Sequence, residues 1–184
     1  AAVVVAAATA ARGGAAPQIA LVPADVIESN VPTSNVQGFA TRLLDGEPSN
    51  RANGGCPGGN GVGVLVFDLK DVYQLTRSRF RSWDDVDNVE RYRISARLDM
   101  SQAWTVLSAA WRSTRDNSFA EITLSGSAAR YVRLEMAYDD CCLASEFELY
   151  GFLQPAQPTP IPTQSPTPAI VPATPTTQPT PIPT

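Results

Sequence analysis

The 184-residue chain contains no histidine. This absence removes the Ser-His-Asp and Cys-His catalytic arrangements, most catalytic zinc sites and pH switching by an imidazole. Positive charge is also scarce, and the net charge of -4 argues against nucleic acid as a partner. No apolar run reaches the roughly 18 residues that a membrane-spanning helix needs. The sequence therefore predicts a non-catalytic protein that neither binds nucleic acid nor spans a membrane.

Cysteine is scarce as well, with only Cys56, Cys141 and Cys142 in the chain. An odd number allows at most one disulfide within the chain and leaves one thiol over. A zinc site is the alternative, but three cysteines without histidine make a poor ligand set. One disulfide is the prediction.

The two ends of the chain differ in composition from its middle. Residues 155–184 hold 11 of the 16 prolines, and no charged residue follows Glu148. Such a segment cannot bury a core and is typical of a stalk or linker, and its Thr-Pro pairs suit O-glycosylation. The first residues, AAVVVAAATAA, are apolar and resemble the remnant of a signal peptide. We expect an N-terminal arm over 1–22, one domain over 23–153 and a Pro/Thr-rich tail over 154–184.

The middle of the chain is rich in short segments that alternate polar and apolar residues. This period of two, interrupted by polar turns, is typical of antiparallel strands, and only residues 36–44 suggest a turn of helix. The expected strands are Val64–Leu69, Leu75–Arg81, Arg91–Arg97, Trp104–Leu107, Ala120–Leu124, Arg130–Tyr138 and Ala144–Phe152. The fold class that follows is all-β.

The order of motifs between Ala40 and Phe152 resembles the discoidin, or coagulation factor V/VIII C-type, family of galactose-binding-like domains. The motifs are LLDGEPSN, GVLVFDL, RFRSWDD, VERYRISARLDMSQAWTVL, ARYVRLEM and LASEFELYG. The resemblance implies an eight-stranded antiparallel jelly-roll sandwich. It also implies that Trp104 is a buried core tryptophan and that Arg130, Tyr131 and Arg133 belong to a framework strand. Trp111 is left as the freest aromatic residue.

The resemblance further implies a structural calcium site. The loop after Leu44 matches the family's calcium-binding loop, and a glutamate of the last strand completes the site in the family. The matching positions are Asp45, Ser49, Asn50 and Glu146. Calcium takes six to eight hard oxygens, which such a loop can supply. The alternative is a plain Asp-Gly turn, with Glu146 on a solvated face. The same topology would place Cys56 near Cys141 and Cys142, so it can pair with either; a strained bridge between the adjacent Cys141 and Cys142 is the other alternative.

Members of the family bind sugars or lipid headgroups through loops at one end of the sandwich. The candidates in this chain are Asp84, Asp85, Asn88 and Arg91 in one loop, with Tyr138 and Asp139 in another. Aromatic rings, arginines and amides are the groups that stack on sugar rings and bind their hydroxyls. The histidine common in galactose-binding members is missing here. The alternative is a solvated acidic end without a ligand.

Two functions follow from these features, both non-catalytic and both extracellular. The first is a structural subunit of a filament or cell surface, in which the arm around Ala2–Ala8 adds a strand to the next copy. The alternative is a secreted carbohydrate-binding module, joined to another domain by the Pro/Thr tail. We expect assembly through the terminal arms as the main function, with glycan binding as its alternative.

Overall fold

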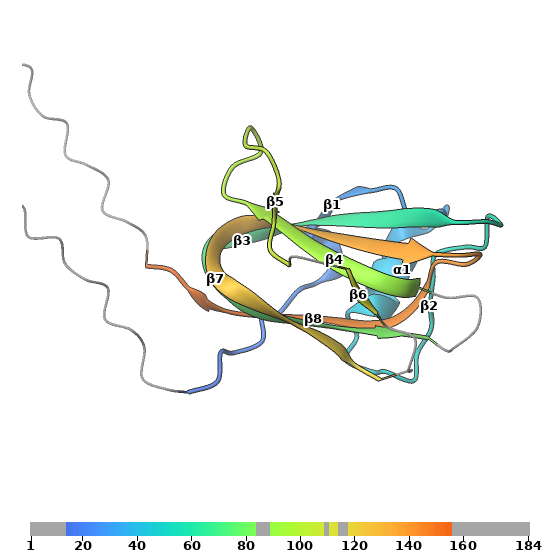
Figure 1. Ribbon diagram of the computed structural model, residues 1–184, viewed down its shortest axis with the longest axis horizontal. Helices are drawn as coiled ribbons and strands as arrows, with labels where there is room; N and C mark the ends of the chain where they lie inside the picture. Colours follow the sequence, from blue (N-terminus) through green and yellow to red (C-terminus); the bar gives the residue numbers. More distant parts are fainter. Residues whose placement is uncertain (1–13, 84–88, 109–110, 114–117, 156–184) are drawn as a thin grey trace, which may run out of the picture.

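The computed structural model of the protein describes residues 14–83, 89–108, 111–113 and 118–155, and Figure 1 shows them as a ribbon. All strand pairs in this part of the chain are antiparallel. The strands are β1 (Val26–Ser29), β2 (Ala52–Asn53), β3 (Gly61–Ser82), β4 (Val89–Arg97), β5 (Thr105–Val106), β6 (Arg112–Ser113), β7 (Ala120–Tyr138) and β8 (Leu143–Leu153). The predicted all-β jelly roll is confirmed.

Two long strands, β3 and β7, each pass through both layers of the sandwich. Residues 61–68 of β3 pair with residues 131–138 of β7, and the register then shifts before pairing resumes from Tyr73. At this bend Lys70 adopts a φ of 68°, and its backbone N–H donates to Asp68 Oδ1 over 2.9 Å. Figure 1 shows β7 curving sharply beside β3. The sequence predicts separate strands here, because the bends interrupt the alternation of polar and apolar residues.

These bends divide the strands into two layers. The first layer has the order β1, β3, β7 and β4, in which β3 contributes residues 61–68 and β7 residues 131–138; β5 and β6 pair with β4. The second layer has the order β2, β8, β3 and β7, with residues 73–82 of β3 and 120–129 of β7. Since two strands belong to both layers, the number of strands depends on how the bends are treated.

The core lies between the layers and is built from aromatic and branched side chains. The ring of Phe67 in the first layer stacks on that of Phe147 in the second, with centroids 5.8 Å apart. Phe80 and Tyr92 make a similar contact across the layers at 5.1 Å. All four rings are buried, so they contribute a large part of the apolar area removed from water.

The N-terminal part of the described chain packs on the second layer. Ile19 is buried, its backbone N–H donates to Leu149 O over 2.7 Å, and Gln18 forms an isolated bridge with Tyr150. Residues 17–21 therefore pack with the domain, although the sequence analysis assigns them to the arm. Residues 1–13 of the predicted arm and residues 156–184 of the predicted tail lie outside the described residues.

The helical elements are η1 (Pro23–Asp25) and α1 (Val36–Leu43), and the latter lies where a helical turn was expected. Asn35 begins α1 and accepts a hydrogen bond from Gly38 N over 2.8 Å. The apolar side of α1 buries Phe39, Ala40 and Leu43, and its end leads directly into the Asp45 loop. No helix in the described ranges has the length and apolar character to cross a membrane.

Candidate functional site

Three of the predicted sugar-binding residues, Arg91, Tyr138 and Asp139, lie at the end of the sandwich where β4 starts and β7 ends. Tyr138 pairs with both Val89 and Gly61, and Arg91 pairs with Ala137, which places Arg91 beside the end of β7. Asp84, Asp85 and Asn88 lie outside the described residues. Of the two predicted loops, the structure therefore describes only Arg91, Tyr138 and Asp139, and the strand pairing places these three residues at the same end of the sandwich.

Only some of these side chains are open to a ligand. Arg91 and Asp139 are exposed. Tyr138 is 8% exposed, and its ring lies where a side chain on Gly61 would otherwise be, since a Cβ there would approach the ring to 2.4 Å. Burial raises the pKa of the Tyr138 phenol. Its ring therefore packs the end of the sandwich and offers little surface on which a sugar could stack.

The aromatic residue that borders this loop end is Trp111, immediately before β6. Its indole is half-buried, and the guanidinium groups of Arg91 and Arg93 lie 5.6 and 4.6 Å from its ring centroid. Cation–π contacts of this kind hold an aromatic ring in place at a surface. The sequence marks Trp111 only as the freest aromatic, and the pairing of Arg112 with Tyr92 and of Ser113 with Arg91 places Trp111 beside Arg93, close to the loop end.

The predicted calcium loop forms a compact turn around Asp45. The two carboxylate oxygens of Asp45 accept hydrogen bonds, one from Glu47 N over 2.9 Å and the other from Asn50 Nδ2 over 2.8 Å. The Ser49 hydroxyl donates to Glu47 Oε1 over 2.7 Å. The Ser145 hydroxyl of β8 donates to Pro48 O, which ties the loop to the last strand. The sequence analysis did not include Glu47, which orders the turn.

Glu146 lies beside this turn as a buried acid. The residue is 2% exposed, and no hydrogen-bond partner within the described chain reaches its Oε2. Burial, followed by repulsion from the nearby Asp45 carboxylate, raises the pKa of Glu146 to about 7, while backbone N–H groups of Phe147 and Gly46 favour the ionised form. Asp45 is exposed and lies 4.0 Å from Arg42, whereas an ionised Glu146 would be a buried charge with one oxygen unpaired, which is unfavourable without a proton or a cation beside it.

The donor set of this turn fits a hard cation. It offers carboxylate, hydroxyl, amide and carbonyl oxygens, which are calcium ligands, and it contains no thiol or imidazole. No group of three or more acidic, cysteine or histidine side chains placed to hold a metal ion occurs among the described residues. A calcium ion here would therefore take its remaining ligands from loop carbonyls and water.

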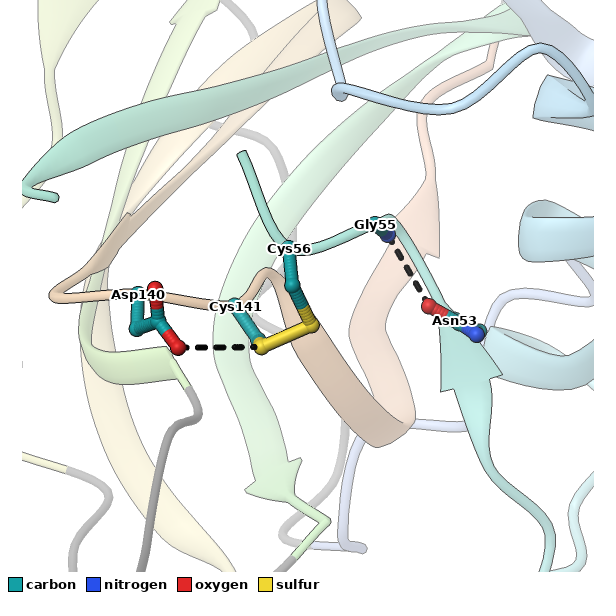
Figure 2. Close-up of a disulfide and its surroundings, with 5 residues drawn as sticks. All are labelled: Asn53, Gly55, Cys56, Asp140 and Cys141. Atoms are coloured by element: carbon teal, nitrogen blue, oxygen red, sulfur yellow. Dashed lines mark hydrogen bonds between the residues drawn. A yellow bond between two sulfur atoms is a disulfide. The ribbon is translucent and has the colours of Figure 1, made fainter. Parts of the chain in front are cut away.

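Cys56 forms a disulfide with Cys141, the first of the two partners that the resemblance allows. The bridge joins the loop after β2 to the segment before β8 and spans 85 residues of sequence (Figure 2). Beside it, the Asn53 side chain accepts from Gly55 N over 2.9 Å, and the Cys141 sulfur lies 3.7 Å from the Asp140 carboxylate. The disulfide therefore links two loops at one end of the second layer.

The remaining thiol, Cys142, belongs to the core. Its backbone exchanges hydrogen bonds with Gly54 and Gly55, both 2.9 Å, and its side chain is fully buried against Gly63. Burial raises the pKa of the Cys142 thiol to about 12, so it stays protonated and unreactive at neutral pH.

The outer face of the first layer carries a cluster of arginines around one buried acid, Glu135. Arg93 binds its carboxylate in a bidentate manner at 2.8 and 2.9 Å, and Arg133 lies 3.2 Å from the same group. The hydrogen bond to Glu135 is the main reason that the pKa of Arg93 is raised. Glu135 is 4% exposed, so these contacts hold the arginine side chains against the sheet.

A groove of about 280 Å³ lies on this outer face, and the sequence analysis did not predict it. It is lined by Glu28, Ser29, Asn30, Val64, Val66, Trp104 and Arg133. Trp104 was expected in the core, but it is half-buried and stands on the sheet's outer side, with the Arg97 guanidinium 4.0 Å from its ring centroid. The expectation was wrong because the loop before β5 folds back over the outer face instead of entering the space between the layers.

No protein-family model and no curated protein matches this sequence. Among solved structures, a family 32 carbohydrate-binding module from Clostridium perfringens, in complex with GalNAc-β-1,3-galactose, is similar with a TM-score of 0.58 and 12% identity. The match covers 73% of this chain and 99% of that one.

Two further structures have the same architecture. The C-terminal domain of a chitobiase from Bacteroides fragilis matches with a TM-score of 0.58 and 14% identity, over 76% of this chain and all of that domain, a coverage of 100%. Chitosan-binding module 1 of a chitosanase/glucanase from Paenibacillus matches with a TM-score of 0.53 and 22% identity, over 73% and 99% of the two chains. The likeness extends over nearly the whole of each of these domains, and this chain accordingly has the galactose-binding-like fold of the discoidin-like domains.

Proposed function

We propose that this chain is a non-catalytic, extracellular carbohydrate-binding module that holds a sugar at the end of the sandwich around Arg91 and Trp111. The observation that carries the proposal is the half-exposed Trp111 indole, held by Arg91 and Arg93 at this loop end. An aromatic face beside a hydrogen-bond donor is the usual means of binding a pyranose. The fold supports it, since similar structures include modules whose names state carbohydrate or chitosan binding.

An extracellular location fits the Cys56–Cys141 disulfide, because such bridges persist in oxidising compartments. The Pro/Thr-rich tail fits the same proposal as a spacer to another domain.

A structural calcium ion is part of the same proposal. The ion would be held by Asp45 and Glu146, with the Ser49 hydroxyl, the Asn50 side-chain oxygen and loop carbonyls as further oxygen ligands. The support is the unpaired, buried Glu146 Oε2 beside a second carboxylate. The ion would supply positive charge to Glu146, since Arg42 lies beside Asp45 alone, and it would fix the loop that follows α1.

The filament function, the main expectation from sequence, rests on segments outside the described residues. The arm of residues 1–13 and the tail of residues 156–184 belong to those segments, and no feature of the described part adds support for assembly. Carbohydrate binding is therefore the better-supported of the two functions.

The experiment is a glycan-array screen of the full chain, followed by isothermal titration with the best-bound sugar. We expect Trp111→Ala to weaken binding at least tenfold, because the stacking surface is lost. Tyr73→Ala is the control, since it removes a half-buried aromatic side chain at the opposite end of the sandwich, where Tyr73 pairs with Ala129 and Leu153. Equal affinity of the wild type and the Trp111 variant would remove this loop end as the binding site.

A further inference from the structure

The groove on the outer face of the first layer is built from four separate segments of the chain. Val64 and Val66 of β3 and Arg133 of β7 form its floor, because Val66 and Arg133 are paired neighbours in the sheet. β1 and the residue after it form one wall, through Glu28, Ser29 and Asn30, and Trp104 forms the other. Trp111 and Arg91 do not line the groove, although Arg133 shares the Glu135 carboxylate with Arg93, on which Trp111 packs.

The indole of Trp104 is preorganised in the protein without ligand. Arg97 stacks on it at 4.0 Å, and the same guanidinium donates to Gln102 O over 3.3 Å, which anchors the loop that carries Trp104. A ring held in this way loses little conformational freedom when a ligand stacks on it, which favours binding.

The polar groups that face the indole have unused hydrogen-bonding capacity. The Asn30 Oδ1 accepts from Val64 N over 2.6 Å, which orients the side chain, while its Nδ2 has no acceptor among the described residues. Glu28 is exposed, and no described side chain pairs with its carboxylate. Arg133 directs one nitrogen to Glu135 at 3.2 Å and retains other N–H donors. The groove thus presents an acceptor, an amide donor and a guanidinium donor around an apolar floor.

From this arrangement we infer that the groove is a second carbohydrate site, which takes one neutral pyranose ring. The ring stacks on Trp104, its hydroxyls donate to Glu28 and accept from Asn30 and Arg133, and its apolar edge covers Val64, because Val66 is only 2% exposed. Its volume of about 280 Å³ lies at the lower end of small-molecule sites, so a single sugar unit fits it better than an extended chain.

The charges select a neutral sugar over an acidic one. Arg133 is already paired with Glu135, and the unpaired Glu28 carboxylate stands at the groove wall. A uronic acid would bring its carboxylate towards Glu28, and this repulsion offsets the attraction of Arg133, which shares Glu135 with Arg93, and of Arg97, which stacks on Trp104. The class of ligand in this inference rests on the proposed function, whereas the site consists of different residues.

The test follows the three tryptophan indole N–H signals of the ¹⁵N-labelled full chain by NMR, assigned with Trp104→Phe and Trp111→Phe. Galactose and N-acetylglucosamine are the neutral probes and glucuronic acid the charged one. We expect a neutral probe to shift the Trp104 signal saturably, with a Kd on the order of 1 mM, because one sugar ring has few atoms to contribute binding energy. Glucuronic acid should bind at least tenfold more weakly.

Two variants then test the groove itself. Glu28→Ala removes an exposed carboxylate and keeps the backbone pairing of β1 with β3, and it should weaken the Trp104 titration at least fivefold while leaving that of Trp111 unchanged. Glu121→Ala, which removes an exposed carboxylate from the second layer, is the matched control and should change neither.

The outcomes separate the two sites. Shifts of both signals with different affinities, or of Trp104 alone, support the groove. A shift of Trp111 alone overturns the groove and leaves the proposed function standing. If neither neutral probe shifts the Trp104 or the Trp111 signal, the inference is overturned. The glycan array then tests the proposed function independently.

Discussion

At the scale of single residues, Glu146 links the fold to pH and to a cation. Its folded-state pKa of about 7 lies above the value of 4.5 for a free glutamate, so the folded protein holds a proton that the unfolded chain releases. A raised carboxyl pKa favours the fold below the unfolded value, and this contribution is lost as pH rises through about 7.

We therefore predict that the protein without metal becomes less stable between pH 5 and pH 8. The difference is on the order of 2 kcal/mol, and denaturant unfolding in EDTA at several pH values measures it. Glu146→Gln, which cannot ionise, should flatten the profile in this range. Asp68 does not interfere, because Arg130 lowers the pKa of that carboxyl and moves its titration to more acidic pH. Parallel profiles for the two proteins would contradict the role of Glu146.

The stabilisation of the fold by calcium should increase with pH, whereas the stability of the protein without metal should decrease. Because only the ionised carboxylate is a good ligand, we predict that calcium raises the melting temperature more at pH 8 than at pH 5.5. Differential scanning fluorimetry with millimolar calcium or EDTA tests this. Glu146→Gln should lose most of the stabilisation, whereas Glu28→Ala, at a distant acid, should keep it. An unchanged melting temperature on calcium addition to the wild type would dismiss the ion.

Glu135 is the second residue on which stability depends. Glu135 is buried and bound by Arg93 and Arg133. Its removal therefore leaves two partly buried guanidinium groups without their carboxylate partner. We predict that Glu135→Ala lowers the free energy of unfolding by about 3 kcal/mol. Glu121→Ala, at an exposed position with looser pairing at 3.4 Å, should cost less than about 1 kcal/mol. Similar losses for the two variants, measured by urea unfolding, would argue against a special role for the buried acid.

At the scale of elements, the bend of β3 decides how the sandwich closes. Lys70 holds a left-handed φ of 68°, which is unfavourable for a residue with a Cβ, while its side chain is largely exposed and lies 3.6 Å from Asp25 and 3.8 Å from Asp68. The strand turns here because Asp68 accepts from the Lys70 amide and, from the other side, from Arg130 at 3.0 Å.

A glycine at this bend should stabilise the protein. Lys70→Gly removes the steric cost of the positive φ, and we predict a gain of about 0.5–1 kcal/mol in the free energy of unfolding. Lys70→Ala is the control, because it loses the same weak ion pairs but retains the Cβ, and it should be neutral or slightly destabilising. If the two variants have equal stability in urea unfolding, the backbone strain at the bend is negligible.

At the scale of the whole molecule, the disulfide joins parts of the chain that are 85 residues apart in sequence. Closing so long a loop restricts the unfolded chain strongly. We predict that Cys56→Ser lowers the free energy of unfolding by about 3 kcal/mol. Cys142→Ala keeps the bridge and removes only a buried sulfur, so about 1 kcal/mol is expected for it. Peptide mapping should show the Cys56–Cys141 bridge in this control, and a Cys56–Cys142 peptide in the wild type would contradict the assignment.

Much of the fold could be predicted from the chain's own patterns. Alternation of apolar residues is a local property, so the segments around Phe67, Ile94, Val132 and Phe147 are recognisable as strands without knowledge of their partners. The order of motifs then resembles one jelly-roll family and limits the topology. The bends in β3 and β7 were not predicted, because a continuous strand that changes layers loses its alternation at the bend.

The candidate sites were predictable only in part. The Asp45 turn and Glu146 carry a recognisable order in the sequence, and the structure places them side by side. The groove had one local signal, the run VLVFDL, in which Val64 and Val66 are apolar although they belong to the outer face. An apolar residue on the solvent side of an antiparallel strand indicates that something covers that face.

By itself, the sequence determined the all-β class, the absence of imidazole chemistry, the acid pair beside the last strand and the possible partners of Cys56. Only the tertiary structure decided that Cys141 is the partner, that Trp104 stands outside the core, and that Glu28, Asn30 and Arg133 meet around it. The reason is physical: strand alternation and turn chemistry act between neighbours in the chain, whereas a site is formed by loop paths and strand register that bring distant segments together. Those depend on how the two layers pack as a whole.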